Sequence, residues 1–217
     1  MNSSVIQLLV LAGVAIFLIL RLRSVLGTRE GFEKPPLTPG DAPSRRPDFE
    51  VIEGGPDRDI TDHVAEGTAA ASALAQMKAA DPDFAVGEFL DGAKGAYEMI
   101  LMAFERGDLS DVEGFLSSDV ATALQSVIDN RTEQGLTVEA DFVGVRETTL
   151  TDATYHEATS LGEVTVKFVG EMTSTVRDAE GRIVEGSPNE IKRQKDVWTF
   201  AREMRSGDPN WQLVATG

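Results

Sequence analysis

Few residues of this 217-residue chain belong to the types that carry out chemistry. There are two histidines, His63 and His156, and no cysteine, so a thiolate zinc site and a cysteine nucleophile are excluded. The common phosphate-binding, metalloprotease and serine-hydrolase motifs are absent from the sequence. The segment that starts at Asp108 resembles a calcium loop in part, but Glu113 stands where such a loop requires glycine. We therefore expect no catalytic residue, no metal site and no cofactor.

Large apolar side chains form a clearer pattern. They recur every three or four positions in residues 84–106, as on one face of a helix, and every second position in residues 163–177, as in a half-buried strand. A helix over a curved sheet would enclose either an ordinary core or an apolar pocket for a lipid tail or hydrophobic peptide. A catalytic site would need a polar pair, and the inward positions of this strand carry no Asp, Glu or His. The candidate pocket residues are Tyr97, Ile100, Phe104, Phe168, Trp198 and Phe200.

The segment 190–198 is the most basic part of a chain whose formal net charge is −16. Its cations Lys192, Arg193 and Lys195 either belong to a solvated strand edge or dock anionic headgroups or an acidic partner. The overall negative charge disfavours nucleic acid as a partner. No small-molecule substrate is expected.

Residues 1–27 are predicted to form a transmembrane anchor that contacts membrane lipid. Between residues 5 and 20 the only polar side chain is Gln7, and a helix of this length crosses a bilayer core of about 30 Å. Three arginines within residues 21–29 follow the apolar run and no basic residue precedes it, which is unlike a cleaved signal peptide. The same arginines predict that the N-terminus lies outside and the rest of the chain on the cytoplasmic side.

Two further segments precede the predicted domain. Residues 28–57 contain six of the nine prolines, which is typical of a disordered, extended tether. Residues 58–82 predict an amphipathic helix that starts near Asp59 and ends at Asp81. Because its apolar stripe is thin and rich in alanine, we expect it to pack loosely on the domain or to remain available for a partner.

Residues 83–217 predict one folded domain of the α+β class, with helices packed on one face of a curved antiparallel sheet. The long helix that ends before Gly107 contains Gly92 and Gly95, which lower its helix propensity and suggest that another backbone passes close by. A third helix follows, with Ser117 or Ser118 as its N-cap and Gly135 after its end. Four strands are then expected, at 136–156, 163–178 with a turn into 183–184, 197–204 and 211–216.

Four segments of this domain resemble the C-terminal domain of the Tim44 family of mitochondrial inner-membrane translocase adaptors. They are E-F-L-x-x-A-K-x-A-Y (88–97), G-D-L-x-x-V-x-x-F-L-S (107–117), D-V-W-T-F-A-R (196–202) and N-W-Q-L-V-A-T (210–216). The resemblance implies a cone-shaped fold, as in nuclear transport factor two and cystatin, and an adaptor role at the inner membrane. The short length and N-terminal span are most similar to alphaproteobacterial TimA-like members. The long basic N-terminal part that recruits the chaperone motor has no counterpart here, so motor recruitment is not implied.

The expected function is that of a non-catalytic adaptor at the bacterial inner membrane. On the cytoplasmic side it would bind membrane proteins or hydrophobic segments, in protein translocation or in the assembly of membrane complexes. Two alternatives stay open at this point. One is a tether between ribosome and membrane, since a mitochondrial large-subunit protein shares this domain, and the other is a small enzyme on the cone fold, of the isomerase or dehydratase type.

Overall fold

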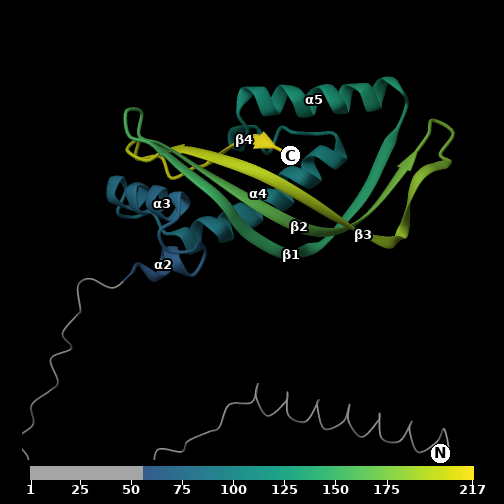
Figure 1. Ribbon diagram of the computed structural model, residues 1–217. Helices are drawn as coiled ribbons and strands as arrows, with labels where there is room; N and C mark the ends of the chain where they lie inside the picture. Colours follow the sequence, from purple (N-terminus) through teal and green to yellow (C-terminus); the bar gives the residue numbers. More distant parts are fainter. Residues whose placement is uncertain (1–55) are drawn as a thin grey trace, which may run out of the picture. The chain divides into compact units, whose positions relative to one another are not determined.

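Residues 56–217 are described by the computed structural model shown in Figure 1. The transmembrane anchor expected at 1–27 lies outside the described residues, and so does the tether expected at 28–57, apart from its last two positions. Between residues 56 and 217, no helix combines the length and the apolar character needed to cross a membrane.

The described residues form an α+β domain, as predicted. The helices come first: α2 (Arg58–Thr61), α3 (Ala69–Ala80), α4 (Val86–Arg106), the short 3-10 helix η1 (Glu113–Phe115) and α5 (Ser118–Glu133). The strands follow: β1 (Thr137–His156), β2 (Leu161–Arg177), β3 (Ile183–Glu203) and β4 (Gln212–Thr216). They pair antiparallel in the order β1-β2-β3-β4, and the sheet is open because β1 and β4 lie at its two edges.

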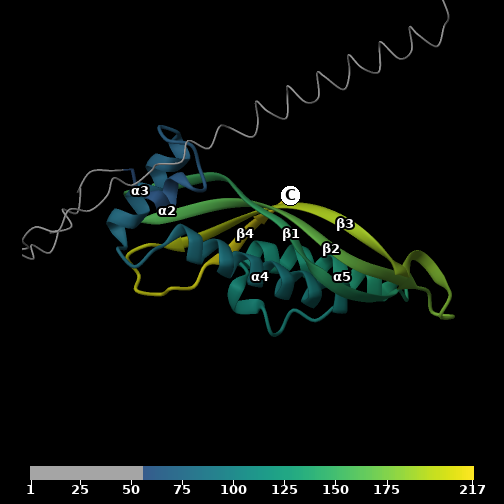
Figure 2. The ribbon, with the colours of Figure 1, turned by 90° about the horizontal axis from the view of Figure 1, so that it is seen from below.

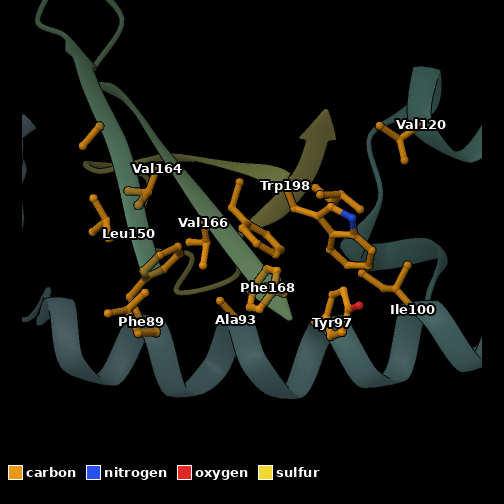
Figure 3. Packing of buried hydrophobic residues seen from close by; sticks show 14 of the residues in the cluster. Phe89, Ala93, Tyr97, Ile100, Val120, Leu150, Val164, Val166, Phe168 and Trp198 are labelled. Carbon is orange, nitrogen blue, oxygen red and sulfur yellow. The ribbon is translucent and has the colours of Figure 1, made fainter. Parts of the chain in front are cut away.

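The core lies between α4 and the sheet. Figure 2 shows α4 and α5 on the same side of the curved strands. Phe89, Ala93 and Tyr97 project from α4 towards Val166 and Phe168 of β2 (Figure 3), and all five are buried. Apolar residues three or four positions apart on the helix therefore pack against apolar residues two positions apart on the strand, in one apolar layer.

The ends of the helices follow the predicted signals. Gly107 ends α4 in the left-handed conformation, with φ of 77°, which an L-residue with a side chain rarely adopts. Ser117 caps α5, and its hydroxyl accepts a hydrogen bond from the Val120 N–H. Gly135 follows α5 with φ of 65°.

The start of α4 is capped from a distant part of the chain. Its N-cap residue is Ala85, whose side chain has no acceptor, and the carboxylate of Asp59 in α2 takes over that role. Asp59 accepts hydrogen bonds from the backbone N–H groups of Val86 and Gly87, at 2.8 and 2.9 Å, and from Lys78 Nζ of α3, at 2.8 Å. One carboxylate thus joins three helices and stabilises the positive end of the α4 dipole.

The single helix predicted over residues 58–82 is wrong. The structure has two helices, α2 and α3, because Gly67 adopts φ of 74° and Thr68 caps the start of α3 by accepting from the Ala71 N–H. A left-handed glycine followed by a strong N-cap residue ends one helical segment and begins another.

The loose packing expected of this segment is also wrong. Leu74 and Met77 of α3 are fully buried, and α3 packs against β1. Alanines beside them on the helix, Ala70 and Ala73, are buried too. Small side chains let the helix approach the sheet closely, so a thin apolar stripe is enough to bury it.

The strand predicted at 197–204 is longer than expected. It joins the Ile183–Val184 segment in one strand, β3, in spite of Pro188 between them. The pairing register with β2 shifts between Met172 and Ser174, opposite the residues around Pro188. Because the ladder is interrupted there, the missing N–H of proline costs no sheet hydrogen bond.

The burial of α3 leads to a stability prediction. Leu74→Ala should lower the free energy of unfolding by about 2–5 kcal/mol, because it leaves a cavity under α3. Gln76→Ala, at an exposed position of the same helix, is the matched control and should change it by less than about 0.5 kcal/mol. Denaturant unfolding followed by circular dichroism measures both, and equal effects would mean that α3 lies outside the core.

A pH prediction follows from Asp59. Burial opposes its charge, but the hydrogen bonds from Lys78, Gly87 and Val86 outweigh burial and lower the pKa of Asp59. Its contribution to the free energy of unfolding is therefore complete above the ordinary pKa of an aspartate. This contribution is lost as the pH falls through the lowered pKa. Asp59→Asn should lower the free energy of unfolding by about 1 kcal/mol at neutral pH. In acid, the variant and the native chain should have the same free energy of unfolding. Unfolding curves from pH 7 to pH 2 would contradict this if the difference stayed constant.

Candidate functional site

Five of the six residues predicted to line an apolar pocket lie in the core. Tyr97 and Phe168 are 0% exposed and Ile100 is 1% exposed, and Trp198 and Phe200 are also buried. The rings of Tyr97 and Phe168 stack with centroids 4.5 Å apart, and Tyr97 lies 4.8 Å from Trp198 (Figure 3). Such ring contacts are those of a close-packed interior.

Phe104, the sixth, lies at the edge of this core and is partly buried. The Arg131 guanidinium of α5 covers its ring at 4.2 Å and pairs with Glu105 at 3.6 Å. Burial raises the pKa of Glu105, the nearby Glu185 adds to the rise, and Arg131 opposes it. The contacts of Arg131 with Phe104 and Glu105 therefore hold α5 against the C-terminal end of α4.

A polar pair at the border of the core, between the buried Tyr97 and the half-buried Asp196, was not predicted from the sequence. The Tyr97 hydroxyl donates to Asp196 Oδ2 at 2.5 Å, and Gln194 Nε2 donates to Asp196 Oδ1 at 3.0 Å. Burial and the Asp196 carboxylate raise the pKa of Tyr97, so the phenol stays protonated and acts as a donor. The sequence did indicate that the Asp196 side chain points inwards, because Asp196 lies two positions before Trp198 and four before Phe200, which both point inwards.

The predicted basic docking site does not form one patch. Lys192 lines a hollow on the inner side of the sheet together with Gln194 and Glu105. Arg193 and Lys195 alternate with Lys192 along β3 and so point to the other face, where Arg193 pairs with Glu171 at 2.8 Å.

The other candidates for chemistry are apart from one another. His63 and His156 are exposed, in the turn after α2 and at the end of β1. Asp108 accepts hydrogen bonds from the side chain and backbone of Ser110, and these bonds lower the pKa of Asp108. Within residues 56–217, no cluster of His, Asp and Glu is placed to hold a metal ion.

A groove of about 330 Å³ runs along α4, and we call it the α4 groove. Its aromatic wall consists of Phe84, Phe89 and Trp211, with the Trp211 ring 5.6 Å from Phe84 and 4.6 Å from Phe89. Phe115 of η1 and Met99 of α4 also line it, and so does Phe200 of β3, one of the six predicted pocket residues. Met99 is 47% exposed. Trp211 and Phe115 are half-buried, whereas Phe84 and Phe89 are buried. The α4 groove therefore presents apolar side chains to water through Met99, Trp211 and Phe115.

Small residues form the part of α4 that faces the groove. Gly92, Ala93 and Ala96 line it, so the backbone of the helix is accessible there. Asp83 and Glu88 also line the groove and make no ion pair within residues 56–217. The groove thus has an apolar floor and a negative rim.

Arg202 fixes the end of the groove that holds the tryptophan. Its guanidinium pairs with Asp81, lies 5.1 Å from the Trp211 ring and donates to the Pro209 carbonyl at 3.4 Å. The Arg202 side chain is 9% exposed, and its Nε has no hydrogen-bond partner among the described residues. Arg202 shares the inward period of Phe200, which is the sequence signal that could have identified it.

The sequence suggested that another backbone passes close to Gly92 and Gly95, and within the described chain this is wrong. A Cβ atom added at either glycine would have no neighbour within 4 Å. Each glycine costs about 1 kcal/mol of helix stability relative to alanine. The domain gains no internal packing in exchange. Gly92 lines the α4 groove, and Gly95 is not among its lining residues.

The packed core leads to a prediction that separates a core from a pocket. Ile100→Trp should lower the free energy of unfolding by about 1–3 kcal/mol, because the added volume has no space between α4 and the sheet. Val127→Trp on α5, where the native side chain is 45% exposed, is the control and should have little effect. Denaturant unfolding measures both. An unchanged stability for Ile100→Trp would reveal a cavity that accepts an apolar guest.

Comparison with known proteins agrees with the resemblance found in the sequence. The family model described as "Tim44-like domain" matches residues 70–217, which include most of α3 and the whole α4 groove. No curated protein sequence matches the chain. A similar solved structure is the "Crystal structure of intermembrane space region of chloroplast protein ARC6", at 9% identity and a TM-score of 0.39, covering 59% of this chain and 94% of that one. Because the family model covers well over half of its length, the chain belongs to the Tim44-like domain family.

Proposed function

We propose that this protein is a non-catalytic adaptor at the inner membrane, and that it binds an apolar segment of a partner protein in the α4 groove. The observation that carries the proposal is the apolar lining of that groove, in which Met99 is 47% exposed and Trp211 and Phe115 are half-buried. Aromatic and methionine side chains are enriched where proteins bind one another. Membership of the Tim44-like family supports a role in protein translocation or in the assembly of membrane complexes.

The groove is a better candidate than the sites expected from the sequence. The aromatic cluster around Tyr97 is occupied by its own rings, and the cations of β3 are divided between two faces of the sheet. The α4 groove is the place where large apolar side chains from α4, η1 and the segment before β4 meet at the surface.

The remaining parts of the proposal concern the rest of the chain. Residues 1–27 would anchor the protein in the bacterial inner membrane as a single span, with residues 28–57 as the tether and the domain on the cytoplasmic side. The arginines that follow the apolar run support this orientation. The curved sheet with helices on one side supports a cone fold of the type found in nuclear transport factor two.

Site-specific crosslinking in native membranes tests the groove. A photoreactive amino acid at Met99 should capture a membrane or translocation protein, because this side chain is exposed within the groove. The matched control is Val143 of β1, which is 54% exposed outside the groove, and it should not capture that partner. Met99→Lys should abolish co-purification of the partner, whereas Val143→Lys should not. The same partners at both positions, or none at Met99, would contradict the proposal.

A further inference from the structure

Gly92 and Gly95 occupy interior, exposed positions of α4, where glycine destabilises a helix. A glycine is retained in such a place when another backbone approaches closely, when the chain needs a left-handed conformation, or when the helix must bend. Neither residue has positive φ, and no other part of the described chain approaches within 4 Å of an added Cβ. A backbone that approaches Gly92 therefore has to come from outside residues 56–217.

The position of Gly92 indicates what approaches. It lines the α4 groove between Glu88 and Ala96, which lie one helical turn before and after it. Gly92 and Ala96 are small residues four positions apart, and such a pair lets a second helix cross with its backbone close to the first. A helix is also the segment that can fill an apolar groove without leaving its own N–H and C=O groups unpaired.

The charges of the groove define the partner further. Asp83 and Glu88 make the rim negative, in a chain of net charge −16, so basic residues beside the apolar face of the partner are favoured.

We infer that the partner segment is an α-helix with an apolar face and basic flanks, and that it crosses α4 in close backbone contact at Gly92. This inference rests on the proposed function, because it concerns the same groove. It adds the conformation of the bound segment and its crossing point. Gly92 is then a residue that lowers the stability of the domain in favour of binding.

Gly92→Ala and Gly95→Ala form a matched pair for testing this crossing point. Both remove a glycine from the exposed surface of one helix, and the two positions lie about 60° apart around it. Each substitution should raise the melting temperature by about 2–4 °C, since alanine favours the helix. Only Gly92→Ala places a methyl group in the path of the crossing helix, and it should weaken binding about tenfold.

The probe is a peptide of about 18 residues made of leucine, alanine and lysine, which forms an amphipathic helix with a basic polar face. The same peptide with proline at its centre cannot form that helix. Each is titrated calorimetrically into the full chain in zwitterionic lipid nanodiscs, with empty nanodiscs as the blank. The helical peptide should bind the native chain and Gly95→Ala equally, should bind Gly92→Ala about tenfold more weakly, and should bind better than the proline peptide.

The outcomes separate this inference from the proposed function. If the proline peptide binds as well as the helical one, or if Gly92→Ala binds like the native chain, the inference fails although the groove still binds apolar segments. Equal weakening by Gly92→Ala and Gly95→Ala would also overturn it, because the effect would not be local to the groove. If neither peptide binds and the Met99 crosslinks are absent as well, the proposed function itself fails.

Discussion

The fold depends on the close approach of α4 to the middle of β2. Tyr97 lies flat on Phe168 there, and its hydroxyl reaches past Gly170 to Asp196 on the next strand. A Cβ at Gly170 would come within 2.7 Å of that hydroxyl, so only glycine leaves room for the ring. This single contact sets the distance between helix and sheet. The same contact turns one side of α4 inwards and leaves the side with Gly92 and Met99 at the surface.

Much of the fold could be predicted because its signals are local. The buried stripe of α4, the caps at Gly107 and Ser117 and the alternation in β2 each lie within one short segment, where sequence period and residue type decide the outcome. The division of residues 58–82 into two helices was missed, although Gly67 and Thr68 carried its signal. The burial of α3 could not be predicted in this way, because it depends on a fit to β1, far along the chain.

The candidate site was less predictable for the same reason. A helical period identifies the apolar side of α4, but it does not say which distant segments border the neighbouring flank that carries Gly92, Ala96 and Met99. The α4 groove combines residues around positions 84, 99, 115 and 211, which only the folded chain brings together. The two exposed glycines were recognised as unusual from the sequence alone. Their meaning required the structure, because the expected neighbour is absent from the described chain.

The carboxylate of Asp59 has a mechanical consequence. A pull on the chain ahead of Pro56 reaches the domain first at α2, a helix of four residues with one buried side chain, Ile60. The hydrogen bonds of Asp59 to the start of α4 and to Lys78 would carry this load together, so they would have to rupture nearly at once rather than one after another. Tension would therefore pass from α2 directly into α4, the helix that forms the floor of the groove.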